Sequence, residues 1–86
     1  MAEGAKLWKA VDEYLVSHLI PSDPVLNETM AANAAAELPS IDVAPNQGKL
    51  LHLLARVAGA RKILEIGTLG GYSTTWLGRA LPEDGR

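Results

Sequence analysis

The sequence predicts an α/β fold in which three helices precede the first β-strand, and a glycine-rich turn leads from that strand into a fourth helix. Three observations support this fold class. Apolar residues recur at helical spacing through most of residues 6–59. Residues 62–66 form a short aliphatic run that contains one carboxylate. Residues 67–73 then bring three glycines together, before a further apolar stretch of helical spacing.

Prolines and capping side chains delimit the first two predicted helices. Residues 6–20 carry leucine or valine at every fourth position, and Pro21 ends this stretch. Asp23 offers a side-chain cap and Pro24 suits the first helical turn, so a second helix is expected to begin at Pro24 and to end near Leu38. The many alanines in this stretch have high helix propensity.

The third helix, the strand and the fourth helix are expected in that order. The third helix begins near Pro45 and ends at Gly59, a residue type that is common just after a helix. The aliphatic side chains of residues 62–66 favour a strand, and the turn signal of residues 82–85 is typical of a connection to another strand. Because one parallel-type strand leaves its backbone groups unpaired, we expect the remaining strands in a longer polypeptide or in another chain.

Composition indicates a globular protein and narrows its partners. The chain is 48% hydrophobic with a formal charge of -2, which argues against disorder. Its basic residues are scattered and its aromatic residues are few, so no nucleic-acid-binding face is expected. The absence of cysteine excludes disulfides and thiolate metal sites. No run approaches the roughly 20 apolar residues of a membrane span, and the N-terminus lacks a signal-type core, so we expect a cytoplasmic protein.

The residues around the glycine turn indicate the charge of a ligand. Gly70 and Gly71 allow the backbone to bend tightly or to approach a ligand closely. Glu65 ends the aliphatic run, where a carboxylate would repel phosphate groups. The stretch also lacks the G-x-G-x-x-G spacing of nicotinamide dinucleotide sites and the lysine of a P-loop. S-adenosylmethionine suits such a site better, because its ammonium and sulfonium attract a carboxylate and its own carboxylate suits a helix N-terminus.

Two segments resemble a known enzyme family. Residues 65–73, with the sequence Glu-Ile-Gly-Thr-Leu-Gly-Gly-Tyr-Ser, are similar to the first cofactor motif of the small cation-dependent O-methyltransferases of the catechol and caffeoyl-CoA type. Residues 41–51 resemble the segment that lies over the methionine end of the cofactor in that family. The resemblance implies the N-terminal part of a Rossmann-like, S-adenosylmethionine-dependent methyltransferase fold. It also implies a helical segment at 1–40 and the truncated start of the cofactor-binding domain at 41–86.

The resemblance assigns five candidate cofactor-binding residues. Glu65 matches an acid that helps to hold the amino acid end of the cofactor, with a plain surface carboxylate as the alternative. Gly67 and Thr68 match turn positions whose backbone lies against the cofactor, with an ordinary tight turn as the alternative. Ser73 matches a hydroxyl donor to the cofactor carboxylate, and it would alternatively cap its own helix. Val43 matches a position whose backbone touches the methionine portion, and it would otherwise be a packing residue.

The implied activity is methyl transfer from S-adenosylmethionine to a hydroxyl of a small phenolic or catechol-like acceptor. In the family, a divalent cation such as Mg²⁺ holds the acceptor oxygens, and by resemblance its ligands and the catalytic residues lie after Arg86. No catalytic residue or metal ligand is therefore assigned within residues 1–86. We expect an N-terminal fragment of a homodimeric enzyme that is inactive alone. The alternative is a non-catalytic helical module whose first two helices mediate dimerisation.

Several other residues have simpler interpretations. His18 and His52 lie on separate predicted helices without a carboxylate or histidine at i, i+4, so they form no metal-ligand pattern. Trp8 and Trp76 lie on apolar helical faces, which favours roles as core or interface anchors. Ala44 stands where many family members have a serine before the proline, so the third helix lacks a side-chain cap worth about 1 kcal/mol.

Overall fold

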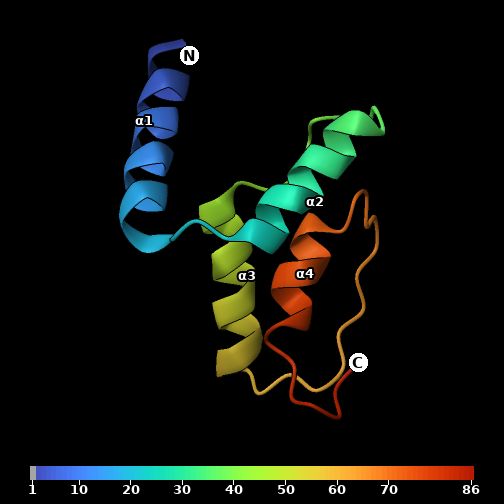
Figure 1. The fold of residues 1–86 in the computed structure, drawn as a ribbon. Helices are drawn as coiled ribbons and strands as arrows, with labels where there is room; N and C mark the ends of the chain where they lie inside the picture. The colour runs from blue at the N-terminus through green and yellow to red at the C-terminus, as the bar shows by residue number, and fades with distance from the viewer. Residues whose placement is uncertain (1) are drawn as a thin grey trace.

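The computed structural model describes residues 2–86 and contains four α-helices within them (Figure 1). The order of the helices and the starting residues of the second and third agree with the sequence prediction. The first helix begins before residue 6, and the second ends before Leu38. The helices are α1 (Ala2–Leu19), α2 (Pro24–Ala35), α3 (Pro45–Val57) and α4 (Tyr72–Gly78). In this part of the chain, no helix has the length and apolar character needed to cross a membrane.

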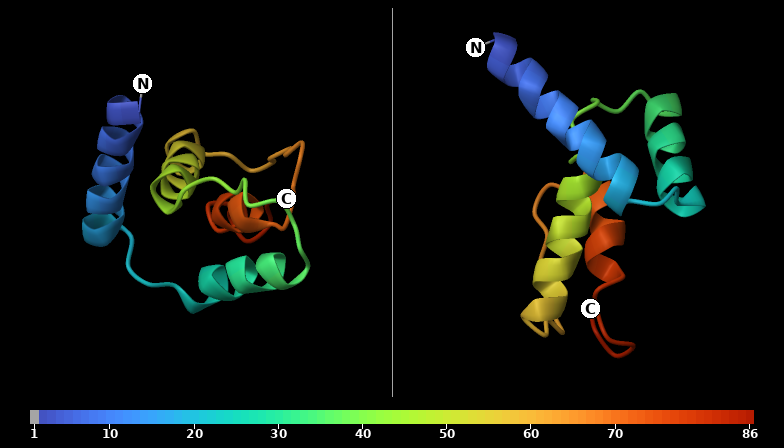
Figure 2. Two further views of the ribbon diagram at one scale, coloured as in Figure 1. Left: turned by 90° about the horizontal axis from the view of Figure 1, so that it is seen from above. Right: turned by 90° about the vertical axis from the view of Figure 1, so that its left-hand side faces the viewer.

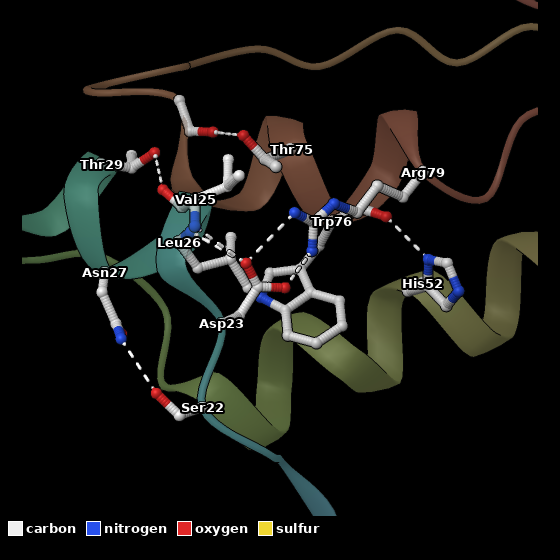
Figure 3. A network of polar contacts seen from close by, with 11 residues as sticks. Ser22, Asp23, Val25, Leu26, Asn27, Thr29, His52, Thr75, Trp76 and Arg79 are labelled. Carbon is white, nitrogen blue, oxygen red and sulfur yellow. Dashed lines mark hydrogen bonds and ion pairs between the residues drawn. The ribbon is translucent and has the colours of Figure 1, made fainter.

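Asp23 fixes the start of α2 and connects this helix to α4 (Figure 3). Its Oδ1 accepts hydrogen bonds from the Val25 and Leu26 amides at 3.1 and 3.2 Å, which is the geometry of an N-cap. Its carboxylate also binds both terminal nitrogens of Arg79, with 2.5 Å between Asp23 Oδ2 and Arg79 Nη1. The Arg79 guanidinium and the capped amides lower the pKa of Asp23 below its ordinary value. One side chain therefore joins two distant segments.

α3 and α4 lie side by side and run in the same direction (Figures 1 and 2). Their close approach depends on Gly48 of α3, which is buried under the indole of Trp76. A Cβ at Gly48 would lie 2.5 Å from Trp76 Nε1. His52 donates from Nδ1 to the Trp76 carbonyl at 2.9 Å, because a carbonyl only accepts (Figure 3). This contact gives His52 a structural role between the two helices.

α1 projects from one side of the molecule and contacts α3 (Figure 2). Lys49 Nζ donates to the Leu19 carbonyl at 2.7 Å, and Asn46 Nδ2 donates to Asp12 Oδ1 at 2.9 Å. The apolar side chains of α1 are largely exposed, and Trp8 is 67% exposed. Trp8 is therefore not a core residue of the described chain.

Residues 62–66 follow an extended path but are not paired as a β-strand, so the predicted strand is absent from residues 2–86 (Figure 1). Within the described residues, the backbone of this segment is paired with another part of the chain only at its start. The Ile63 amide donates to the Arg86 carbonyl at 2.8 Å, and the Arg86 amide donates to the Arg61 carbonyl at 3.0 Å. These two bonds are what one step of a parallel ladder requires. A strand needs such bonds along its whole length, and the described chain supplies only this step.

The two faces of this extended segment differ in their surroundings. Its side chains alternate as they do in a strand, with Ile63 and Glu65 on one side and Leu64 and Ile66 on the other. Ile63 and Glu65 lie with Leu77 around a hollow of about 130 Å³ beside α4. Leu64 and Ile66 are 87% and 90% exposed. α4 therefore covers one face, and the described chain leaves the other face bare.

The core of the described chain is small. Its buried hydrophobic residues are Leu26 of α2 and Tyr72 of α4. A folded domain of about this length normally buries roughly 60% of the surface of its unfolded chain. Here the apolar side chains of α1 and of residues 62–66 remain at the surface. The helices are held mainly by the specific contacts among α2, α3 and α4.

Candidate functional site

A small hollow lies between the loop before α3 and the glycine turn before α4. Its volume is about 120 Å³. The structure thus brings together parts of the two segments, residues 41–51 and 65–73, on which the family resemblance depends. Four of the five candidate residues line the hollow, and Glu65 lies behind one of them. The lining residues are Ile41, Asp42, Val43, Gly67, Thr68, Leu69 and Ser73.

Backbone conformation shapes the turn that forms one wall of the hollow. Gly67 and Gly71 have φ angles of +84° and +90°, which glycine adopts at little cost. Leu69 also has a positive φ, +53°, which is uncommon for a residue with a side chain. The Gly71 amide donates to the Thr68 carbonyl at 3.1 Å, and Gly71 is the N-cap residue of α4. Ser73 lies inside the helix, so the alternative that it caps α4 is wrong.

Gly70 packs against α2. A Cβ at Gly70 would overlap the side-chain amide of Asn33, which is 8% exposed. Asn33 Nδ2 in turn donates a long hydrogen bond of 3.4 Å to Asp42 Oδ1. The glycine therefore allows α2 to approach the turn, and Asn33 connects the two walls of the hollow. The absence of a side chain at Gly70 therefore has a packing reason within the chain.

Glu65 is held between two hydroxyl groups at the start of α4. Ser73 Oγ donates to Glu65 Oε2 at 2.6 Å, and Thr74 Oγ1 donates to Glu65 Oε1. The carboxylate is half-buried and points at the helix. Thr74 was not a candidate from the sequence. The sequence feature that could have identified it is the run of three hydroxyl residues at 73–75, which follows Glu65 across a tight turn.

Two carboxylates give the hollow a negative charge. Asp42 lines it directly, and the Glu65 carboxylate lies one hydrogen bond behind Ser73. Among the described residues, those that line the hollow include no lysine, arginine or histidine. A phosphate group would be repelled here, and a cationic group would be attracted. Asp42 was also missed from the sequence, because a single aspartate in a loop gives no sign that a distant turn lies beside it.

The hollow can hold only part of a molecule as large as S-adenosylmethionine. Sites for small ligands are typically about 300–1,000 Å³, and this hollow is about 120 Å³. It has room for a small charged end of such a molecule. The remaining contacts require residues outside those that line it.

Larger hollows elsewhere in the described chain have different linings. One of about 470 Å³ includes Arg61 and Arg79, whose guanidinium groups are paired with Asp84 and Asp23. Another, of about 520 Å³, runs beside the bare extended segment at residues 62–64. Within residues 2–86, no group of three or more histidine or acidic side chains is placed to hold a metal ion.

Known proteins resemble most of this chain. A family model described as O-methyltransferase matches residues 16–86. A catechol O-methyltransferase from Niastella koreensis is 47% identical over 81 residues, which are 94% of this chain and 37% of that protein. This chain therefore spans little more than a third of that relative.

Two solved structures share the fold of this segment. The O-methyltransferase from Bacillus cereus in complex with SAH has a TM-score of 0.90 and 58% identity, over 94% of this chain and 37% of that chain. The O-methyltransferase TomG from Streptomyces achromogenes, in complex with SAM, has a TM-score of 0.85 and 53% identity, over 94% of this chain and 36% of that chain.

Proposed function

The chain belongs to the O-methyltransferase family, and we propose that it forms part of an S-adenosylmethionine-dependent enzyme that methylates a hydroxyl of a small phenolic or catechol-like acceptor. The structural likeness to S-adenosylmethionine-dependent O-methyltransferases supports a Rossmann-like fold, of which these four helices are one part. One step of parallel pairing, between residues 61–63 and Arg86, is consistent with the beginning of its sheet.

The observation that carries this proposal is the acidic hollow beside the glycine turn. It unites four residues that the resemblance assigned to the cofactor, Val43, Gly67, Thr68 and Ser73. Its charge suits the ammonium of the cofactor, with Glu65 behind Ser73. Its small volume suits the amino acid end rather than the whole cofactor. We therefore assign these residues to that end.

When bound, S-adenosylmethionine supplies a methyl group on a sulfonium, which an acceptor oxygen takes in line. The residues of this chain hold and orient the cofactor. The resemblance further implies a divalent cation such as Mg²⁺ at the acceptor. By the same resemblance, its ligands lie after Arg86.

The test is methyl transfer by the full polypeptide that contains this segment. We expect a monomethylated product from catechol and S-adenosylmethionine in the presence of Mg²⁺, detected by mass spectrometry, and little product after chelation of the metal. We expect weak cofactor binding by the 86-residue chain alone in calorimetry, because its hollow contacts only one end of the ligand. Failure of the full polypeptide to bind S-adenosylmethionine would contradict the proposal.

We also propose that two copies of the enzyme pair through α1. Leu7, Trp8 and Tyr14 are 62%, 67% and 63% exposed on this helix, and aromatic side chains are enriched in protein interfaces. Sedimentation should show a dimer that Trp8→Glu weakens, whereas Lys9→Glu, on an already polar position, should not. The same exposed face supports the second candidate function, a non-catalytic dimerisation module. That module would dimerise without binding S-adenosylmethionine.

Two further expectations remain predictions. The boundary between a helical segment at 1–40 and a cofactor-binding domain at 41–86 is one of them, although the Asp23–Arg79 pair crosses it. Limited proteolysis of the full polypeptide would test this boundary. The other is a cytoplasmic location, which fractionation of cells would test.

A further inference from the structure

The turn after α4 contains an aspartate that is followed by a glycine, Asp84–Gly85. The other aspartates of residues 1–86 precede glutamate, proline or valine. An aspartate becomes isoaspartate when the amide nitrogen of the next residue attacks its side-chain carboxyl carbon. Glycine is the most permissive next residue, because it has no Cβ to hinder the approach and its backbone turns freely. Asp84 is also exposed, so it is the aspartate of this chain that is most open to the reaction.

Arg61 contacts the chain on both sides of the Asp84–Gly85 bond. Its guanidinium pairs with the Asp84 carboxylate. Its carbonyl accepts a hydrogen bond from the Arg86 amide at 3.0 Å, and a Cβ at Gly85 would lie 3.1 Å from the same carbonyl oxygen. The Gly85 amide donates to the Pro82 carbonyl at 2.8 Å. The two groups that would react are therefore each engaged with another partner.

These contacts oppose the reaction for chemical reasons. A carboxylate that is kept ionised by a guanidinium is a poor electrophile, because its oxygen cannot leave as water until it is protonated. The amide nitrogen attacks only after it has lost its proton, and the Gly85 proton is held in the turn. The side chains of Arg61 and Asp84 are 63% and 70% exposed, however. An exposed ion pair is weak and opens readily, so it slows the reaction without preventing it.

We propose that Asp84 is a site of spontaneous isoaspartate formation and that Arg61 restrains it. The Gly85 nitrogen gives its proton to solvent and bonds to Asp84 Cγ, a Cγ–O bond breaks, and the oxygen leaves as water. A second water then attacks the backbone carbonyl carbon of Asp84 and breaks its bond to the Gly85 nitrogen. The main chain now runs through Cγ, the former backbone carbonyl is the free carboxylate, and the mass is unchanged.

The product would disturb the one parallel step that the described chain makes. An isoaspartate adds one carbon to the main chain between residues 84 and 85. Arg86, two residues later, exchanges hydrogen bonds with the Arg61 carbonyl and with the Ile63 amide, at 3.0 and 2.8 Å. Both bonds require Arg86 in its present register, because a parallel ladder has fixed spacing. Isomerised molecules should therefore lose this pairing.

The experiment follows isomer formation in the full polypeptide during storage at neutral pH. Trypsin cleaves after Arg79, so the peptide that begins at Ala80 contains Asp84. Its isoaspartate form has the same mass, separates by chromatography and gives distinct fragments on electron transfer. We expect Arg61→Gln to raise the rate about two- to fivefold, the range that loss of an exposed ion pair allows. Lys62→Gln, which removes the next cation along the chain, is the matched control and should not change the rate.

Two further arms separate the site from its restraint. In urea the contacts of Arg61 are lost, so the unmodified protein and Arg61→Gln should isomerise at one rate, faster than the native protein does. Asp84→Glu should form no isomer, because its side chain would have to close a larger ring. In the isomerised fraction, hydrogen exchange at the Ile63 and Arg86 amides should lose protection. Equal native rates with and without Arg61 would overturn its role, and a lack of isoaspartate at residue 84 even in urea would overturn the site.

Discussion

The cluster of α2, α3 and α4 is joined by polar contacts between its helices, whereas α1 and the extended residues 62–66 leave most of their apolar side chains at the surface. Within the cluster, Asp23 caps one helix and binds Arg79 of another. Outside it, Trp8 is 67% exposed and Ile66 is 90% exposed. The first region contains the buried residues Leu26 and Tyr72, but it too leaves an apolar side chain exposed on α3, where Val57 is 86% exposed. The exposed apolar side chains of the second region are typical of a surface that packs against another segment or another protein.

The physical reason for the difference lies in the hydrogen bonds of each element. A helix satisfies its backbone internally, so caps and a few side-chain contacts are enough to fix its ends. A strand obtains its backbone hydrogen bonds only from neighbouring strands. Residues 62–66 therefore need partners that residues 2–86 do not supply. The site lies where the two regions meet, because Glu65 comes from the extended segment and Ser73 from α4.

Replacing Ile66 by alanine should have the largest effect on stability, and this effect should differ between the 86-residue chain and the full polypeptide. In the 86-residue chain the side chain is 90% exposed, so the loss should be small. In the full polypeptide we expect the free energy of unfolding to fall by about 2–5 kcal/mol, because a sheet and its covering layer would bury this residue. Denaturant unfolding of both lengths measures the contrast. Equal small effects in the two lengths would show that this face stays bare.

Replacing Gly48 by alanine should damage the self-contained cluster. The new Cβ would lie 2.5 Å from Trp76 Nε1, so the Trp76 indole or the two helices would have to move. We expect a loss of about 1–3 kcal/mol in the free energy of unfolding of the full polypeptide, the usual cost of overpacking. Gly4→Ala on α1 is the control, because nothing lies within 4 Å of a Cβ there. The control should gain about 0.5–1 kcal/mol from helix propensity, and a similar gain at Gly48 would disprove the close packing.

Gly70→Ala should have a similar or smaller effect, and it distinguishes a helix contact from a ligand contact. A Cβ there would overlap Asn33, so we expect a loss of about 1–3 kcal/mol from overpacking. Adding Asn33→Ala should restore much of that stability, because the two residues share one space. Unfolding of the single and double variants measures this coupling. Additive losses would mean that Gly70 is required for another reason.

The local features of the fold were predictable from the sequence. Asp23 caps α2 as its place before a proline indicates. Ala44 makes no side-chain cap at the start of α3. Gly59 adopts a φ of +63° just after that helix. Each of these outcomes depends on residues within a few positions, which is the range over which capping rules operate.

The long-range features could not be predicted in the same way. Nothing near Gly70 in the sequence indicates that Asn33 will fill the space beside it. The resemblance supplied Val43, Gly67, Thr68 and Ser73 as a group, but not the hydroxyl contacts that fix Glu65. Those contacts depend on how the turn aims α4, which is decided by backbone conformation rather than by residue type. The strand was predicted from its side chains and is absent because its neighbours are missing from the described residues.

Removing the charge of Asp23 should weaken the cluster by less than the glycine changes, and its effect should depend on pH. Asp23→Asn keeps a good N-cap residue but loses the ion pair with Arg79, whereas Asp23→Ala loses both. The folded-state pKa of Asp23 lies below its ordinary value of 3.8. The stability that its charge contributes is therefore complete above 3.8 and is lost as the pH falls through the lowered pKa. Urea midpoints of the original protein and Asp23→Asn should converge in strong acid, and a constant difference would exclude the ion pair as its cause.

The smallest effect is expected at Ala44, where a cap is missing but is partly replaced. Ala44 already has the extended backbone of an N-cap residue, with φ -64° and ψ 155°, so Ala44→Ser needs no rearrangement. Asn46 Oδ1 accepts from the Gln47 amide at 3.0 Å, so one of the free donors at this helix end is already used. We therefore expect Ala44→Ser to raise the free energy of unfolding by only about 0.5 kcal/mol. In a protein that carries Asn46→Ala, which removes the contact with the Gln47 amide, we expect the same change to raise it by about 1 kcal/mol. Ala44→Val, which cannot cap, should give no gain in either background. Equal gains from serine in both backgrounds would mean that Asn46 does not compensate for the missing cap.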